Sequence, residues 1–307
     1  MLKRIGFWLI IVVLIGAAFG GGYLLARPSE GGVEGAEGLT VIDGAGRVVT
    51  IAETPERIVS IASACTETLY AIGCGDKVVG VDQYSDYPPE VQDKPCVGTG
   101  SSLNLEMVLG LEPDLVLAWW YNSEAIGNLE KLGIPVVAIN PRSVDEVMDT
   151  IRLLGLITDH VSEADNLVAE MQDKIDEITA KVEGLEKAER PLVYYELGTP
   201  MKTTGPGTFT NELVFMGGGI NLAADEPVRY PILSSEYIIE RNPDVIVVVS
   251  YGASIEEVMN RDGWKHINAV VNNRIYQIDT HLVTCSPRLI QGLEQFARWF
   301  HPDLFGD

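Results

Sequence analysis

Two glutamates stand at matching positions of a phrase that the chain contains twice. In residues 104–117 and again in residues 234–247, a glutamate (Glu106 or Glu236) precedes a Pro-Asp pair by seven positions, and apolar residues follow that pair. Each copy predicts a short helix, a turn and a buried strand. An acid early in a helix complements the helix dipole, which is worth about 0.3–1 kcal/mol. The repetition also predicts two similar lobes with a ligand site between them, which favours a binding protein over an enzyme.

Aromatic side chains gather where strands are expected to end. Tyr84, Trp119 and Tyr230 lie in or just after polar or proline-rich turns in both halves of the chain, and Trp120 and Tyr121 follow directly. Aromatic faces bury a large flat ligand well, and tyrosine hydroxyls can bond to its edge. We therefore expect these residues to line a ligand cleft. The competing interpretation places them in the core, where aromatic residues are frequent.

His281 is the histidine best placed to contact a metal. It lies in the loop before residues 286–288, at the expected mouth of the cleft. A neutral imidazole there could make an axial contact to a chelated metal, and the competing interpretation is a plain surface histidine. His160, His266 and His301 do not cluster with it, and no spacing resembles a structural zinc site. We expect no metal site of the protein's own.

Composition excludes several classes of function. At 307 residues the chain is long enough for two domains. Its formal net charge of −22 excludes nucleic acid as a partner, because binding it needs a concentrated positive surface. This acidity fits a solvated surface, with salt adaptation or a basic docking partner as alternatives. The sequence has no nucleophile-elbow, Walker or dinucleotide motif, so we expect neither an enzyme nor a bound cofactor. The enzymatic alternative is a metal- or tetrapyrrole-processing protein of the same shape.

The first 26 residues predict a membrane anchor or a signal segment. Lys3 and Arg4 precede an apolar run that reaches about residue 25, and no cysteine ends this run to carry a lipid. Such a run can span a bilayer with its basic end in the cytoplasm, which places the rest of the chain at the extracytoplasmic face. An uncleaved anchor is the preferred interpretation, and a cleaved signal peptide is the alternative. Residues 27–46 predict a flexible tether, since they include a stretch rich in Gly and Glu.

Alternating strand and helix patterns predict an α/β fold with an N-terminal lobe, 47–158, and a C-terminal lobe, 185–307. Such alternation implies mostly parallel sheets with helices on their faces. The first lobe is expected to have strands at 57–61, 78–82, 115–119 and 136–140, and helices at 66–72, 123–132 and 143–157. The second is expected to have strands at 192–197, 245–249 and 274–278, and helices at 210–216, 235–241, 255–261 and 287–300.

A linking helix is expected at residues 159–184. Apolar residues recur there at spacings of four and three and form one stripe, made of Leu167, Met171, Ile175, Ile178 and Val182. A helix of this length is on the order of 30 Å long, about the width of a domain. The expected fold is therefore two similar lobes with central, mostly parallel sheets, joined by one long rigid α-helix, with the ligand cleft between them. An ordinary surface helix of either lobe is the alternative.

Four cysteines lie outside the cytoplasm in this scheme, and they allow three pairings. Cys74 with Cys96 would lie within one lobe and is the preferred pair. Cys65 with Cys285 would tie the lobes together across the cleft and oppose any opening, so we do not expect it.

From about Val48 to Phe305 the chain resembles the substrate-binding proteins of ABC importers for iron chelates, haem and cobalamin, and most closely the cobalamin-binding members. The resemblance rests on the order and spacing of several motifs, located at residues 55–60, 66–67, 80–89, 104–106, 111–119, 132–136 and 286–289. It implies two α/β lobes joined by one long helix, with a shallow cleft and little hinge motion. The implied partners are a permease with its ATPase subunits and a metal-chelate ligand; we expect a monomer.

The resemblance also implies roles for individual residues. Glu106 and Glu236 would form salt bridges with arginines on the permease, one from each lobe. The aromatic residues Tyr84, Trp119 and Tyr230 match positions that contact the corrin ligand in the cobalamin-binding members.

Several cleft positions depart from the pattern of those members. Lys202 replaces a phenylalanine and would suit a ligand with carboxylates, with a solvated lysine as the alternative. Aromatic, acidic and basic positions of the cobalamin-binding members are here occupied by Thr99, Gly100, Thr280 and Thr284. Cobalamin or a related corrinoid is therefore the leading ligand, and a ferric siderophore or haem is the alternative.

Overall fold

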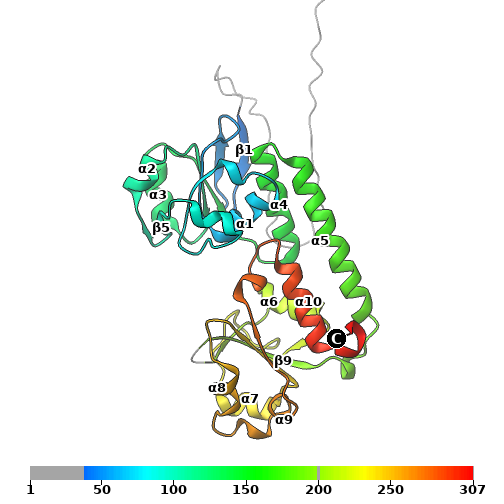
Figure 1. Ribbon diagram of the computed structural model, residues 1–307. Coiled ribbons are helices and arrows are strands. Elements are labelled where there is room, and N and C mark those ends of the chain that lie inside the picture. Colours follow the sequence, from blue (N-terminus) through cyan, green and yellow to red (C-terminus); the bar gives the residue numbers. More distant parts are fainter. Residues whose placement is uncertain (1–37, 199–200, 307) are drawn as a thin grey trace, which may run out of the picture.

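In the computed structural model of the chain, which describes residues 38–198 and 201–306, two α/β lobes are arranged along one long helix (Figure 1). The N-terminal lobe has a parallel four-stranded sheet in the order β4-β3-β7-β8. Its strands are β3 (Ile58–Ile61), β4 (Val78–Val81), β7 (Leu115–Trp119) and β8 (Val136–Ile139). The helices of this lobe are α1 (Ser63–Ala71), α2 (Leu105–Gly110), α3 (Ser123–Lys131) and α4 (Val144–Thr158).

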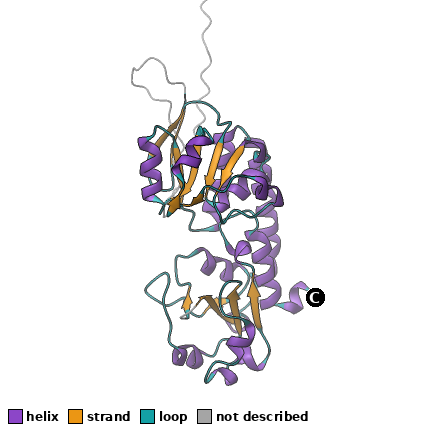
Figure 2. Cartoon of the chain, turned by 60° about the vertical axis from the view of Figure 1, so that its left-hand side comes forward, coloured by secondary structure: helices purple, strands orange, loops and turns teal. Residues whose placement is uncertain are grey.

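The C-terminal lobe has a five-stranded sheet in which β9, β12 and β13 run parallel in that order. Two short strands pair with β9 on its other side, β10 antiparallel and β11 parallel. The strands are β9 (Leu192–Gly198), β10 (Lys202–Thr203), β11 (Ile220–Asn221), β12 (Val245–Val249) and β13 (Ile275–Ile278). The helices are α6 (Phe209–Met216), α7 (Ser235–Arg241), α8 (Ile255–Met259), α9 (Asn268–Val271), α10 (Leu289–Phe300) and α11 (Pro302–Phe305). Figure 2 shows the two sheets in separate lobes beside the long helix.

Short elements complete the described chain. The hairpin of β1 (Leu39–Ile42) and β2 (Val48–Ile51) packs on the first lobe, and β5 (Gly98–Thr99) pairs with β6 (Ser102–Leu103). The 3-10 segments are η1 (Gly75–Lys77), η2 (Pro89–Asp93), η3 (Lys187–Glu189), η4 (Trp264–His266) and η5 (Thr280–Val283). Residues 39–46, which the sequence assigns to a tether, therefore belong to the folded lobe. The buried Asp43 carboxylate fixes this hairpin by accepting the Ala138 N–H at 3.0 Å.

Helix α5 (Val161–Val182) joins the lobes, because it packs against α4 of the first lobe and against α6 and α10 of the second. Its buried stripe is that of a helix with one apolar face and consists of Ala164, Val168, Met171, Ile175, Ile178 and Val182. Gly155 lets α4 and α5 approach closely, since a Cβ at this position would lie 2.4 Å from the Cβ of Ala164. The expected fold of two lobes joined by one long helix is confirmed.

The repeated phrase forms the same structure in both lobes: α2 leads into β7, and α7 leads into β12. In each copy the aspartate of the Pro-Asp pair fixes the neighbouring strand. Asp114 accepts the N–H of Arg57 at the start of β3 at 3.0 Å, and Asp244 accepts the N–H of Leu192 at the start of β9 at 3.0 Å. The Pro-Asp turn therefore sets the register of the central strands.

The expected cysteine pairing is wrong, because all four cysteines are free thiols. Cys74 is buried, and its sulfur bonds to the Thr158 hydroxyl on α4 at 3.2 Å. Cys96 lies exposed beside Val81 at the edge of the sheet. Burial raises the pKa of the Cys285 thiol to about 12, which keeps it protonated.

In the described residues no helix is both long and apolar enough to cross a bilayer. The predicted anchor or signal segment, 1–26, lies outside those residues.

Candidate ligand site between the lobes

A cavity of about 690 Å³ opens where β3, β4 and β7 of the first lobe end. From β3 the sheet continues to β4 on one side and to β7 on the other, so this is the point where the strand order reverses. Open α/β sheets bind ligands at such points, outside the carboxyl ends of their strands. We call this surface the N-wall, and the residues that matter for its chemistry are Asp82, Tyr84, Trp119, Tyr121, Asn122 and Asn128.

Aromatic rings form much of the N-wall. Trp119 and Tyr121 are nearly parallel, with an interplanar angle of 7° and ring centroids 6.1 Å apart. Tyr84 is exposed, with 59% of its surface accessible, and lines the same cavity. Trp120 meets Tyr121 edge-on and is exposed, but it is not part of the lining of this cavity. The structure thus brings three of the five predicted aromatic residues together and leaves Trp120 beside them.

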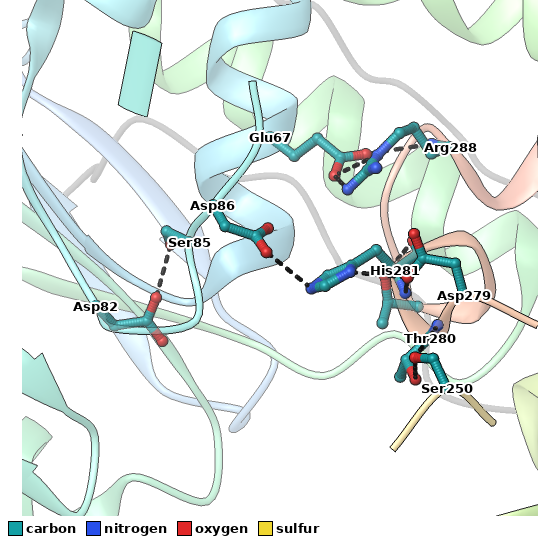
Figure 3. Close-up of polar contacts among 10 residues, drawn as sticks. Glu67, Asp82, Ser85, Asp86, Ser250, Asp279, Thr280, His281 and Arg288 are labelled. Carbon is teal, nitrogen blue, oxygen red and sulfur yellow. Dashed lines mark hydrogen bonds and ion pairs between the residues drawn. The ribbon is translucent and has the colours of Figure 1, made fainter. Parts of the chain in front are cut away.

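Asp82 supplies a carboxylate in the floor of the N-wall. It follows β4, is only 4% exposed, and accepts a hydrogen bond from the Ser85 hydroxyl at 2.6 Å (Figure 3). Ser85 bonds in turn to the Thr66 hydroxyl at 2.9 Å, and Thr66 donates to Ser60 at 2.8 Å. Burial raises the pKa of Asp82, and the hydrogen bonds from Ser85 only partly offset this effect. Asp82 could not be identified from sequence, because an aspartate after a strand is also an ordinary turn residue.

A second cavity, of about 760 Å³, lies at the ends of β9 and β12 in the other lobe. We call this surface the C-wall, and its chemistry comes from Lys202, Tyr251, Glu257 and Arg261. Tyr251 was also missed, although the repeat contains it: it stands seven residues after Asp244, as Tyr121 stands seven residues after Asp114. Following the repeat past the two strands would have predicted one tyrosine for each wall.

Charges on the C-wall are largely paired. The Arg261 guanidinium makes two bonds of 2.7 Å to Glu196, which is fully buried and also accepts the Tyr194 hydroxyl at 2.8 Å. Glu257 accepts the Ser254 N–H at 2.7 Å in a capping box of α8, and this hydrogen bond helps to lower the pKa of Glu257.

Lys202 is the exception on this wall. Its ammonium group lies 5.6 Å from the ring centroid of Tyr230, and in the described part of the chain it has no ion-pair partner. It is therefore the cation of the C-wall best able to meet a ligand, and Tyr230 supports it through its ring face.

A polar seam connects the lobes beside these walls. Glu67 on α1 receives bonds from Arg288 at 2.9 and 2.7 Å, and the Arg288 guanidinium lies 3.8 Å above the Tyr87 ring. His281 lies 3.4 Å from Asp86 of the other lobe and 2.9 Å from Asp279 (Figure 3). Both ring nitrogens of His281 thus face carboxylates, so its predicted contact with a metal would have to compete with these bonds. No cluster of three metal-ligating side chains exists among the described residues.

The two repeated glutamates lie away from the walls. Glu106 is in the first turn of α2 and Glu236 in the first turn of α7, and both are exposed. Figure 1 shows α2 and α7 at the outer parts of the two lobes, away from α5. Neither carboxylate has a hydrogen bond or ion pair with any residue in 38–198 or 201–306.

Two similar lobes joined by one long helix, each with a ligand-sized cavity at the ends of its parallel strands, have the architecture of a solute-binding protein. Comparison with known proteins agrees, since the model of the periplasmic binding protein family matches residues 58–282. The chain therefore belongs to the periplasmic binding protein family.

The sequence similarity to its relatives covers most of the chain. It is 38% identical over 275 residues to the uncharacterized ABC transporter substrate-binding lipoprotein YvrC of Bacillus subtilis, covering 87% of each chain. It is 31% identical over 278 residues to the cobalamin-binding protein of Halobacterium salinarum, covering 86% of this chain and 74% of that one.

Solved structures agree as well. The vitamin B12-binding protein BtuF of Vibrio cholerae superposes with a TM-score of 0.69 at 26% identity, covering 81% of this chain and 98% of BtuF. The haem-binding protein RhuT of Roseiflexus superposes with a TM-score of 0.72 at 27% identity, covering 81% of this chain and 99% of RhuT.

These findings confirm the resemblance stated from sequence and the expected location. The chain is a substrate-binding protein of an ABC importer, it acts at the extracytoplasmic face, and it works with permease and ATPase components. The family is a class of substrate-binding proteins and not a class of enzymes.

Proposed function

We propose that this substrate-binding protein carries a metal chelate, and that the chelate is a corrinoid such as cobalamin. The observation that carries this proposal is the parallel pair of Trp119 and Tyr121 in a cavity of about 690 Å³, with Tyr84 beside it. Flat aromatic faces contact a planar macrocycle over a large area, and the tyrosine hydroxyls remain free to bond its edge. The names of the Halobacterium relative and of BtuF support the same ligand class.

Haem or a ferric siderophore is the second candidate. Lys202 favours it, because an ammonium group on the C-wall that has no ion-pair partner among the described residues suits the carboxylates of haem or of an acidic siderophore. The likeness to RhuT, whose name specifies haem, supports this alternative.

Glu106 and Glu236 are proposed to dock the two lobes on arginines of the permease. Both are exposed and free of partners in the described chain, and both occupy the first turn of a helix of the repeated unit. Matched charges on two lobes orient a docking protein and speed its encounter with the partner.

The first 26 residues are proposed to hold the protein at the membrane by their own apolar run. The Bacillus relative is named a lipoprotein, whereas the first cysteine of this chain is Cys65, far beyond that run. The bound protein is proposed to act as a monomer.

The test is calorimetric titration of the full-length protein in detergent with cyanocobalamin, haemin and a ferric siderophore in parallel. We expect saturation by cyanocobalamin at one molecule per chain, and recovery of the ligand chemically unchanged. Saturation by haemin or the siderophore alone would replace the corrinoid by the second candidate. Chemical conversion of any bound chelate would point to an enzyme.

A further inference from the structure

The N-wall contains a buried acid without a cation beside it. Asp82 is 4% exposed, lines the cavity, and in the described chain forms no ion pair. The rest of the lining of this cavity includes Glu124 but neither lysine nor arginine. A carboxylate taken out of water without a counter-charge destabilises a fold, so its presence at a ligand cavity calls for a functional reason.

Hydroxyl groups orient this acid from behind. The chain Ser60–Thr66–Ser85 ends in the 2.6 Å bond that Ser85 donates to Asp82 Oδ1. Only Ser85 donates to Asp82, but because the three linked hydroxyls come from β3, α1 and the loop after β4, the carboxyl group is held in one position relative to the Trp119–Tyr121 pair. Its charge also reaches the ligand space, since burial raises the pKa of Tyr121 and the Asp82 carboxylate adds to this effect.

We propose that Asp82 is a specificity-determining residue, which accepts hydrogen bonds from amide N–H groups on the ligand and disfavours ligands that bear carboxylates. This inference rests on the proposed corrinoid function and names the side-chain chemistry that the site selects. A carboxylate accepts N–H bonds strongly, and a second carboxylate close to it in a dry pocket would be repelled. The acid therefore distinguishes an amidated corrin from one with free acid side chains, and from haem with its propionates.

The experiment compares two corrinoids with opposite side chains on the full-length protein. Dicyanocobinamide carries amides and dicyanocobyrinic acid carries carboxylates, and neither has the nucleotide phosphate of cobalamin. Calorimetry should give a preference for cobinamide of about 100-fold, and Asp82→Asn should reduce this preference at least tenfold, because its amide can also donate to a carboxylate. Glu124→Gln, an exposed acid of the same cavity, is the control and should leave the preference within about twofold.

The outcomes separate the inference from the function on which it rests. An unchanged preference in Asp82→Asn, or an equal effect of Glu124→Gln, would overturn the role of Asp82 while the corrinoid function stands. Failure of the unaltered protein to bind cobinamide and cyanocobalamin would overturn the proposed function itself. Circular dichroism checks folding, and Asp82→Ser serves as a second variant without the charge. Unfolding of both variants would assign the acid to fold stability and reject the proposal.

Discussion

The N-wall and the C-wall are built from the same repeated unit but differ in chemistry. In both lobes a strand preceded by a Pro-Asp turn ends near a tyrosine, Tyr121 in one and Tyr251 in the other. Beyond this shared tyrosine the walls diverge. The N-wall adds parallel aromatic rings and a buried acid, whereas the C-wall adds a neutralised Arg261–Glu196 pair and a lysine. Neither this acid nor this lysine has an ion-pair partner within residues 38–198 and 201–306. The repeat thus accounts for the framework, and the residues around the strand ends give the ligand two chemically different surfaces.

Glu106 and Glu236, which are proposed to dock on the permease, are the positions at which the two lobes should remain equivalent. In proteoliposomes with the permease and ATPase, Glu106→Ala with Glu236→Ala should abolish transport, a loss of more than about 100-fold, because two charge pairs are removed. The two single variants should lower transport by similar amounts, and ligand affinity should not change in any of these variants. Glu170→Ala with Glu240→Ala, which removes two other exposed acids, is the control for charge. Normal transport, or a loss of ligand affinity, would reject docking by these residues.

The Glu67–Arg288 ion pair of the polar seam stabilises the contact between the two lobes. Arg288→Ala should lower the free energy of unfolding by about 3 kcal/mol, because Glu67 is left buried without its cation. For a chain of this size the melting temperature should fall by about 6–12 °C. Removing both charges, with Glu67→Gln and Arg288→Met, should recover most of the loss. Each ~1 kcal/mol shifts the melting temperature by roughly 2–4 °C. An Arg288→Ala variant that melts within about 1–2 °C of the unaltered protein would therefore contradict a stabilising role of this ion pair.

Lys202 tests the difference between the walls on the C-wall. If it meets an anionic group, Lys202→Gln should weaken cyanocobalamin about fivefold, as expected for a partly solvated ion pair. Dicyanocobinamide lacks the nucleotide phosphate, so its affinity should stay within about twofold. Equal weakening of both ligands in calorimetry would show that the lysine acts through packing on Tyr230 and not through charge.

Substitution of Asp82 should have a small effect on the stability of the fold. Its pKa is raised in the folded state, so at neutral pH the ionised form is less favourable there than in the unfolded chain. Asp82→Asn removes this penalty, and its melting temperature should lie about 2 °C above that of the unaltered protein. The difference should shrink as the pH falls below the raised pKa, and it should vanish once the pH is also below the ordinary pKa that the aspartate has in the unfolded chain. A variant that melts lower at neutral pH would show that the carboxylate stabilises the fold.

Much of the framework could be predicted from the sequence because it depends on local patterns. The bounds of β7, α7 and β12 coincide with those expected, and α5 lies within the expected range of 159–184, since buried strands and an amphipathic helix leave continuous apolar signals. The cysteines could not be paired, because Cys74 turns toward Thr158 and only the packing of α1 against α4 determines that. The role of Asp82 could not be predicted for the same reason, since it depends on tertiary packing. Nothing in the sequence around Asp82 indicates that this aspartate is buried and has no ion-pair partner among the described residues.

In the proposed site, one ligand lies between the N-wall and the C-wall and contacts both. Calorimetric titration of the full-length protein with cyanocobalamin tests it most directly, comparing Trp119→Ala on the N-wall with Tyr251→Ala on the C-wall. We expect one molecule per chain, with each variant weakening binding of that molecule about 10-fold or more. The neighbouring Trp120→Ala should change affinity by less than about threefold. Binding of two molecules per chain, or full affinity in either wall variant, would contradict a shared site.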